Sequence, residues 1–289
     1  MILNNEKRVI SYIMNKRLFI TDLDGTLLNS NCEVSENTKK IINSLTQKGV
    51  CFSVATARTI MSVRHILDGL DISVPAVLMT GVCLYDMKKE EYIHCHYINE
   101  DSVRRFCDIV GGAKDISPYI YTIRDNELTV YCEQMDTPEA RAFAEERRQK
   151  YGKRFVMLKS FGDLDPSNTL YFVIMAKKEL VDPYYQRLKG DPELYYSYYR
   201  DIYDKSIYYL EICSKDASKA GGIRYLRENY GFTQIHCFGD NNNDIPMFRE
   251  SDYSYAVANA LPEVREMASE VIASNDEDGV ALKIKELCQ

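Results

Sequence analysis

Hydrophobic and polar positions in the first eighty residues form short apolar runs separated by amphipathic stretches. The apolar runs lie at residues 17–22, 50–58 and 76–81. Between them, residues 35–49 and 59–70 place apolar side chains three and four positions apart, which is the spacing of one helical face. Strands that alternate with helices in this way predict a parallel sheet with crossover helices.

The same alternation returns near the C-terminus. The pattern there predicts a helix, a buried strand, a second helix start, a further strand and a closing helix, at 216–230, 234–240, 243–251, 253–259 and after 277–279. Between the two halves, strand-like runs are amphipathic and rich in tyrosine, and helical stretches intervene. This texture is typical of an antiparallel α+β insertion.

We therefore predict an α/β fold with a Rossmann-like parallel-sheet core, helices on both faces of that sheet, and an inserted α+β cap domain. The core takes residues 17–84 and 209–289, and the α/β cap takes 85–208. Residues 1–16 are interpreted as an N-terminal extension, because they contain no uninterrupted apolar segment of the kind that a secretory signal needs.

Composition narrows the class of protein. Hydrophobic residues make up 45% of the 289 residues, charged residues 27%, and the formal net charge is −7. A net acidic chain without a long basic run argues against nucleic-acid binding, and no apolar run approaches the length of a membrane span. Nine cysteines without a C-x-x-C motif favour free thiols in a reducing cytoplasm. The oligomeric state is not predicted.

Polar side chains follow the predicted strands where ligands bind in open parallel sheets, beyond the carboxyl ends. Asp22 and Asp24 end the first strand, and two-residue spacing in an extended chain points both side chains the same way. Asp-x-Asp-Gly by itself is equally typical of a plain turn. A calcium loop is excluded, because Leu27 stands where that loop requires glycine.

A second acidic group and two further polar residues belong to the same predicted edge. Asp240 and Asp244 lie four positions apart in GDNNND, a run with more polar residues than a helix cap requires. Carboxylates without paired His or Cys suit Mg²⁺. Thr56 at a strand-to-helix junction and Lys219 at a helix start could bind a phosphate. Taken singly, Thr56 is more often a helix cap and Lys219 a solvated surface residue.

The order of these segments carries a resemblance. DLDGT, VATAR, a lysine before a helix and GDNNND together resemble the four motifs of the haloacid dehalogenase superfamily of phosphohydrolases. The chain is most similar to the Cof-like branch, in which a large α/β cap is inserted between the second and third motifs. The resemblance covers most of the predicted core, and in the insertion it is one of layout and length. It implies a phosphoric monoester hydrolase acting on a sugar phosphate or a phosphorylated cofactor.

The resemblance also implies roles for individual residues. Asp22 would be the nucleophile that forms an aspartyl phosphate, and Asp24 would act as general acid and then general base. The implied ligands of Mg²⁺ are Asp22, the backbone carbonyl of Asp24, and Asp240, with support from Asp244. The implied phosphate-binding residues are Thr56, Lys219 and Asn243. Arg58 is interpreted as a substrate or cap contact, with a surface salt bridge as the alternative.

Two positions depart from the family pattern, and two other functions stay open. Ala57 replaces a glycine, which is harmless unless its φ is positive, and Thr80 replaces an asparagine before Gly81.

A phosphomutase would return the phosphoryl group to a second hydroxyl, and a non-catalytic sensor would bind a phosphorylated metabolite without turnover. Tyrosines at 195–210 could contact the small phosphorylated partner, although packing of the sheet is the stronger interpretation.

Overall fold

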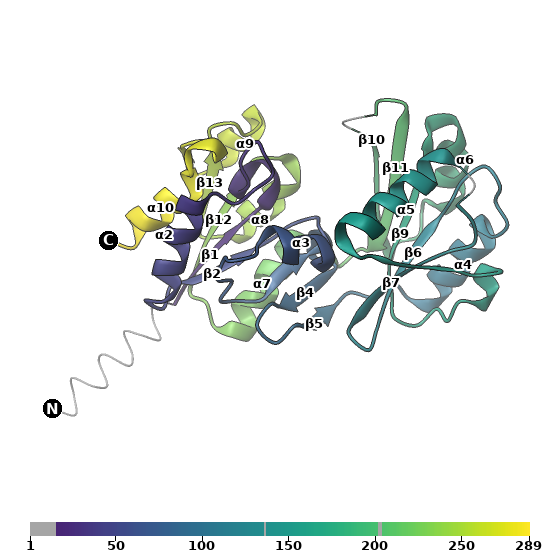
Figure 1. The fold of residues 1–289 in the computed structure, drawn as a ribbon, viewed down its shortest axis with the longest axis horizontal. Helices are drawn as coiled ribbons and strands as arrows, with labels where there is room; N and C mark the ends of the chain where they lie inside the picture. The colour runs from purple at the N-terminus through teal and green to yellow at the C-terminus, as the bar shows by residue number, and fades with distance from the viewer. Residues whose placement is uncertain (1–15, 136, 202–203) are drawn as a thin grey trace. The chain divides into compact units, whose positions relative to one another are not determined.

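The computed structural model describes residues 16–135, 137–201 and 204–289, and the chain forms two compact units (Figure 1). The first unit takes the chain up to His94 together with Ser218–Gln289, and the second takes Cys95–Ala217. Apart from Lys16, the predicted N-terminal extension lies outside the described residues. The functional division into core and cap at residues 84/85 and 208/209 stays a prediction.

The first unit is built on a parallel sheet, which in the described part of the chain has five strands in the order β14-β13-β12-β1-β2. These strands are β1 (Arg17–Thr21), β2 (Cys51–Val54), β12 (Gln234–Gly239), β13 (Tyr253–Val257) and β14 (Glu270–Ile272). Four of the five residues of β1 are fully buried, because helices cover both of its sides. The continuous apolar run predicted from the sequence is what a strand in such a position requires.

Helices lie on both faces of this sheet. Consecutive residues of a strand point to opposite faces of its sheet, so Cys237 and Phe238 of β12 show what covers each face. Phe238 stacks on Tyr255, whose ring lies under Lys283 of α10, whereas Cys237 faces Ser251 at the end of α8. Helix α2 packs against α10, and α7 packs against α8 (Figure 1). The helices of this unit are α2 (Glu36–Thr46), α3 (Ile60–Ile66), α7 (Lys219–Tyr230), α8 (Ile245–Glu250), α9 (Pro262–Met267) and α10 (Gly279–Leu287).

A small sheet extends the first unit. It has the order β3-β4-β5 among the described residues, and a parallel bridge from Ala55 to Val77 connects β3 to the end of β2. Its strands are β3 (Ala76–Leu78), β4 (Cys83–Asp86) and β5 (Glu91–Cys95). This pairing with β3 is why the chain stays with the first unit as far as His94, beyond the predicted limit at residue 84.

The second unit is a mixed sheet with the order β10-β11-β9-β6-β7-β8 within residues 95–201 and 204–217, antiparallel except between β7 and β8. A tight turn connects β6 to β7, where Asp125 and Asn126 both have positive φ. The strands are β6 (Tyr119–Arg124), β7 (Glu127–Cys132), β8 (Arg154–Met157), β9 (Thr169–Lys177), β10 (Leu194–Arg200) and β11 (Ile207–Ser214). The predicted fold class, a parallel-sheet α/β core with an inserted α+β unit, is confirmed.

Two sets of helices cover the mixed sheet. On one face, Phe106 stacks on Phe172, and α4 and α6 close a core with the strands beneath them. On the other face, Tyr119 stacks on Phe143, and its hydroxyl donates to the carbonyl of Ala140. These helices are α4 (Glu100–Val110), α5 (Pro138–Tyr151) and α6 (Lys178–Leu188).

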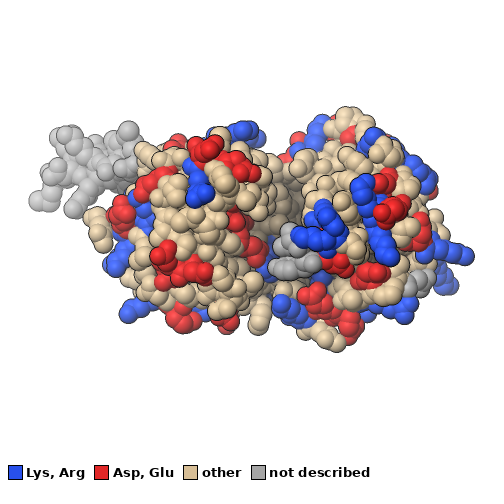
Figure 2. All heavy atoms as spheres, turned by 90° about the horizontal axis from the view of Figure 1, so that it is seen from above, with Lys and Arg blue, Asp and Glu red and all other residues tan. Residues whose placement is uncertain are grey.

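The surface carries both signs of charge. On the face drawn in Figure 2, Lys and Arg side chains are interspersed with Asp and Glu.

No helix in residues 16–135, 137–201 and 204–289 combines the length and the apolar character needed to cross a bilayer.

Candidate active site

The first strand delivers Asp22 to the carboxyl edge of the parallel sheet. The backbone N–H of Asp22 donates to the carbonyl of Phe238 at 2.9 Å, and only 8% of its side chain is exposed. The chain then turns sharply through Leu23–Leu27, with Gly25 at φ +78°. A Cβ at Gly25 would lie 2.5 Å from Oδ2 of Asp240, so only glycine allows the two segments to approach this closely.

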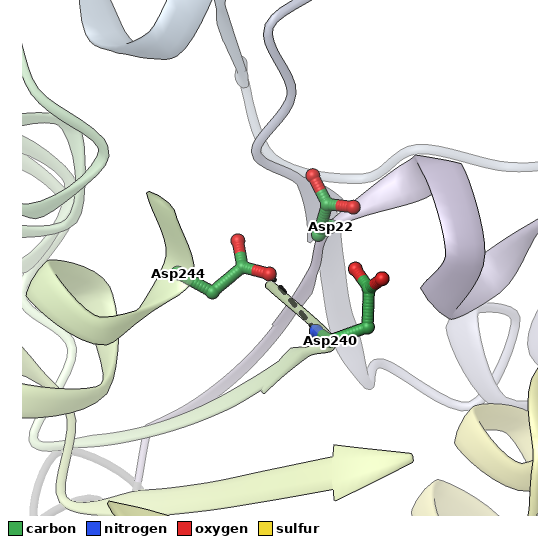
Figure 3. Close-up of side chains that lie close together, drawn as sticks. All are labelled: Asp22, Asp240 and Asp244. Atoms are coloured by element: carbon green, nitrogen blue, oxygen red, sulfur yellow. Dashed lines mark hydrogen bonds between the residues drawn. The ribbon is translucent and has the colours of Figure 1, made fainter. Parts of the chain in front are cut away.

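The strand beside it, β12, delivers the second acidic group. Oδ2 of Asp244 accepts the backbone N–H groups of Asp240 at 2.9 Å and of Asn241 at 3.1 Å. Figure 3 shows the carboxylates of Asp22, Asp240 and Asp244 side by side, with the bond from Asp244 to the Asp240 backbone. One oxygen from each of the three lies within 4.8 Å of the others. The structure therefore brings together the two acidic motifs that the sequence separates by over two hundred residues.

Lys219 lies between two of these carboxylates. It is the first residue of α7, and its helix is capped by the Ser218 hydroxyl, which accepts the N–H of Gly221. The ammonium is 2.5 Å from Oδ1 of Asp22 and 2.6 Å from Oδ1 of Asp244, and the residue is 1% exposed. Its burial excludes the alternative of a solvated surface lysine.

The titration of this cluster is set by burial and by its internal charges. Burial lowers the pKa of Lys219, but the Asp22 and Asp244 carboxylates outweigh it, so the net pKa is above the usual value. Burial raises the pKa of Asp22 above its ordinary range, and Lys219 opposes that rise. Burial, together with the charge of Asp244, also raises the pKa of Asp240 to about 6. With all groups ionised, three carboxylates and one ammonium leave two negative charges unbalanced (−3 + 1 = −2).

A divalent cation fits this surplus of charge. Oδ1 of Asp240 accepts a hydrogen bond from Thr26 at 3.0 Å, and its other oxygen is not used in a hydrogen bond among the described residues. Both oxygens of Asp244 are taken by Lys219 and by backbone N–H groups, which suits an orienting role better than direct ligation. Oxygen ligands without His or Cys suit Mg²⁺.

Asp24 lies on the solvent side of the turn and binds Arg58. Nε of Arg58 donates to Oδ2 of Asp24 at 2.7 Å and Nη2 donates to Oδ1 at 2.6 Å, a bidentate geometry. The side chain of Asp24 is 51% exposed. Sequence reasoning allowed Arg58 a surface salt bridge but did not connect it to Asp24.

Thr56 is buried and connects the backbone at Arg58 with the backbone at Thr80. It is 1% exposed, its hydroxyl accepts the N–H of Arg58 at 3.2 Å, and its carbonyl accepts the N–H of Thr80 at 2.9 Å. Ala57 has no positive φ, so its departure from glycine introduces no backbone strain. Thr80 has φ 56° and ψ 31°, a left-handed conformation in which asparagine is far better tolerated than a β-branched residue.

Asn243 is the site residue that the structure does not connect to the others. It lies in the short helix Asn242–Asp244 and is exposed, and within the described residues its side chain has no hydrogen bond to the three carboxylates. Its predicted role in phosphate binding stays a prediction.

Sequence reasoning missed two residues that support the site. Thr26 donates to Asp240, and Nδ2 of Asn259 donates to the carbonyl of Gly25 at 2.7 Å. Thr26 belongs to the DLDGT motif and could have been singled out there. Asn259 follows β13, so the rule about polar residues after parallel strands could have found it too.

Comparison with known proteins agrees with this geometry. The family model described as haloacid dehalogenase-like hydrolase matches residues 19–284. YxeH of Bacillus subtilis (strain 168) is 28% identical over 283 residues, covering 94% of this chain and 98% of that protein. YitU of the same strain, named a 5-amino-6-(5-phospho-D-ribitylamino)uracil phosphatase, is 26% identical over 288 residues, covering 93% and 96%.

A solved structure shares the fold. BT4131, described as a subclass IIB sugar phosphatase of the haloacid dehalogenase superfamily, superposes with a TM-score of 0.66 at 19% identity, covering 94% of this chain and 99% of that one. The matched family model spans both halves of the first unit and the inserted unit between them. The chain therefore belongs to the haloacid dehalogenase-like hydrolases, in their Cof-like branch, and is a phosphomonoesterase of the haloacid dehalogenase type.

Proposed function

We propose that the protein is a Mg²⁺-dependent phosphatase that hydrolyses a small phosphorylated metabolite through an aspartyl phosphate on Asp22. The observation that carries the proposal is the fully buried ammonium of Lys219, held between Asp22 and Asp244. The substrate class, a sugar phosphate or a phosphorylated cofactor, is supported by the names of YitU and BT4131.

Asp22 needs a compensating positive charge to attack a phosphate. Two unit charges of like sign at about 4 Å repel each other by roughly 4 kcal/mol at an effective dielectric of about 20. Lys219 is fixed 2.5 Å from the attacking carboxylate, and its position requires no rearrangement when charge develops. Burial favours the neutral amine of a lysine, and the carboxylates of Asp22 and Asp244 together keep this one charged.

Asp22, Asp240 and the backbone carbonyl of Asp24 would hold the Mg²⁺, and Asp244 would orient Asp240 through its backbone N–H. The ion would supply a second positive charge to the phosphate oxygens. Thr56 would position the phosphate from the neighbouring strand end.

Asp24 would act as the general acid and then as the general base. It would give a proton to the leaving oxygen as the phosphoryl group moves to Asp22, and it would then take a proton from the water that hydrolyses the aspartyl phosphate. Both of its oxygens accept a hydrogen bond from Arg58, and each oxygen keeps a lone pair for the proton that Asp24 would transfer.

The test is phosphate release from p-nitrophenyl phosphate by wild type, Asp22→Asn and the matched surface variant Asp68→Asn. We expect Asp22→Asn to lose all measurable release while its circular dichroism is unchanged, and Asp68→Asn, which alters an exposed aspartate, to keep wild-type activity. Activity should disappear with EDTA and return with Mg²⁺. Turnover by a folded Asp22→Asn would overturn the nucleophile, and turnover that survives chelation would overturn the metal. With a sugar phosphate as the substrate, an isomer formed without free phosphate would identify a phosphomutase.

A further inference from the structure

Asp24 is carried by a sharp turn of the backbone. The turn, Leu23–Leu27, is closed by the N–H of Leu28, which donates to the carbonyl of Leu23 at 2.9 Å. Gly25, the residue after Asp24, has φ +78°, where glycine has more conformational freedom than any other residue. The side chain of Asp24 is half exposed, so its place relative to the acidic cluster depends on the backbone that carries it.

Two asparagines from the C-terminal part of the chain hold this turn. Nδ2 of Asn259, in the loop after β13 (Tyr253–Val257), donates to the carbonyl of Gly25 at 2.7 Å. Nδ2 of Asn275 donates to the carbonyl of Leu28 at 2.9 Å. One of these carbonyls lies within the turn and the other directly after it. Asn259 and Asn275, called the asparagine clamp below, therefore fix the turn at two points.

The two members of the asparagine clamp also fix each other. The backbone N–H of Asn275 donates to Oδ1 of Asn259 at 3.1 Å. A backbone N–H can only donate, so it selects the amide oxygen of Asn259 and leaves the amide nitrogen to face the carbonyl of Gly25. Asn275 itself begins a short helix, in which the N–H of Ser274 donates to Oε2 of Glu277 at 3.1 Å. The clamp thus has one defined orientation.

The loop that carries Asn259 also binds the second acidic motif. The N–H of Leu261 donates to the carbonyl of Asp240 at 2.9 Å. Asp240 in turn lies against the turn, because a Cβ at Gly25 would be 2.5 Å from its Oδ2. One loop therefore binds the backbone on both sides of the close contact between Gly25 and Asp240. A displacement of this loop would move Asp24 relative to the acidic cluster.

We infer that Asn259 and Asn275 are positioning residues for Asp24, acting through the backbone of the turn. Proton transfer requires the acid to lie within hydrogen-bond reach of the leaving oxygen, and a misplacement of about 1 Å can cost about 100-fold in rate. The inference rests on the proposed function, in which Asp24 is the general acid and base. It adds that the clamp, through the carbonyls of Gly25 and Leu28, keeps the Asp24 carboxyl where that role needs it.

Two aryl phosphates that differ in their leaving group test this role in the full chain. p-Nitrophenolate leaves without a proton, whereas the more basic phenolate of phenyl phosphate needs one from Asp24. We expect Asn259→Ala and Asn275→Ala each to lower kcat/KM for phenyl phosphate about 10-fold, and for p-nitrophenyl phosphate by no more than about threefold. An equal loss with both substrates, or no loss with either, would overturn the inference.

Asn43 offers a matched control in the same unit. Its Nδ2 donates to the carbonyl of Gly69 at 2.8 Å, and its Oδ1 accepts the N–H of Asp71 at 2.8 Å. Asn43→Ala therefore removes the same two kinds of hydrogen bond as Asn259→Ala, in segments that carry neither acidic motif. We expect Asn43→Ala to keep the wild-type ratio of kcat/KM between the two substrates. A ratio changed as much as in Asn259→Ala would show that the effect does not depend on the clamp.

A double variant tests whether Asn259 acts through Asp24. In Asp24→Asn the general acid is absent, so its placement no longer matters. We expect the addition of Asn259→Ala to lower kcat/KM for phenyl phosphate by no more than about twofold further. A further loss as large as in the single variant would mean that Asn259 acts independently of Asp24, contrary to the inference.

Hydrogen exchange separates failure of the clamp from failure of the proposed function. The N–H of Leu28 bonds across the turn, so a peptide that covers the turn should exchange faster in both clamp variants than in wild type and Asn43→Ala. If wild type hydrolyses neither aryl phosphate, the proposed function fails, while exchange still decides whether the clamp orders the turn. Unchanged exchange in both clamp variants would overturn the inference even in an active phosphatase.

Discussion

Lys219 in the first unit and Lys153 in the second are both buried next to aromatic or acidic groups, and the two lysines are in opposite electrostatic situations. Lys219 in the first unit touches two carboxylates at 2.5 and 2.6 Å. Lys153 in the second unit, 7% exposed, lies over the ring of Tyr121 at 5.1 Å, and no carboxylate of the described residues pairs with it. The pKa of Lys219 is raised, whereas burial and the nearby Arg147 lower the pKa of Lys153 to about 7.

The difference shows what a buried cation needs in order to remain charged at neutral pH. Desolvation acts on both lysines in the same direction, towards the neutral amine. Only the carboxylates of Asp22 and Asp244 reverse it, and those residues also belong to the proposed catalytic machinery. A fixed charge is useful where a phosphate has to bind, whereas the ring of Tyr121 offers Lys153 only a weak partner.

The largest effect is expected when the paired lysine is removed. Lys219→Met leaves two buried carboxylates without their cation, and we expect the free energy of unfolding to fall by about 3–5 kcal/mol in the absence of Mg²⁺. The chain has no Trp, so urea unfolding would be followed by far-UV circular dichroism. Hydrogen exchange of β1 and β12 peptides would assign the transition to the first unit. A loss that Mg²⁺ does not partly restore would argue against a cation at the acidic cluster.

The matched change in the second unit should act in the opposite direction. Lys153→Met removes a charge that burial disfavours, and at pH 7 we expect the free energy of unfolding to rise by about 1–4 kcal/mol. The pKa of Lys153 in the folded chain, about 7, lies below its ordinary value of 10.5, so the unfolded chain binds more protons between these values. Wild type is therefore expected to gain stability as pH rises from 7 to 10.5, and the advantage of Lys153→Met should shrink across that window. A constant advantage across these pH values would exclude titration of Lys153 as its source.

A smaller gain in the free energy of unfolding is expected for a change at Thr80, in the segment that packs on the start of α7. A Cβ at Gly81 would lie 2.0 Å from the carbonyl oxygen of Ser218, so the segment Met79–Gly81 packs directly on the helix start that carries Lys219. Thr80 is strained there, and Thr80→Asn should raise the free energy of unfolding by about 1 kcal/mol, because asparagine tolerates positive φ. Thr80→Val keeps the β-branch and should give no gain in the same thermal or urea measurement. Equal stability of the two variants would count against backbone strain.

The smallest effect on stability is expected for the exposed ion pair. Arg58→Met breaks two hydrogen bonds to Asp24, but water can solvate the half-exposed carboxylate. We expect the free energy of unfolding to change by no more than about 1 kcal/mol, measured as for Lys219→Met. A loss as large as that of Lys219→Met would mean that pairing, and not burial, decides the difference between the two lysines.

The sequence predicted the parts of the site that follow from strand order. Asp22, Thr56 and Asp240 each follow a parallel strand, and such ends meet at one edge of the sheet. The helix carrying Lys219 was also predicted, because its periodicity is local. The partners of Lys219 could not be predicted, since they depend on how closely α7 approaches the sheet. The Arg58–Asp24 pair was missed because it likewise depends on how two segments distant in sequence approach each other. Nothing in the residues around Lys153 marked that lysine as buried.

The place of β1 within the sheet has a consequence for synthesis on the ribosome. Strand β1 pairs with β2 on one side and with β12 on the other. Thr21 of β1 can pair with Phe238 of β12 only after Phe238 has been synthesised. At about 5–20 residues per second, roughly 10–40 seconds separate the synthesis of these two residues. During that time the second unit can fold completely, whereas one edge of β1 stays open to other chains. We expect nascent chains arrested before residue 234 to bind chaperones through β1, and protease protection of β1 in such chains would contradict this order of folding.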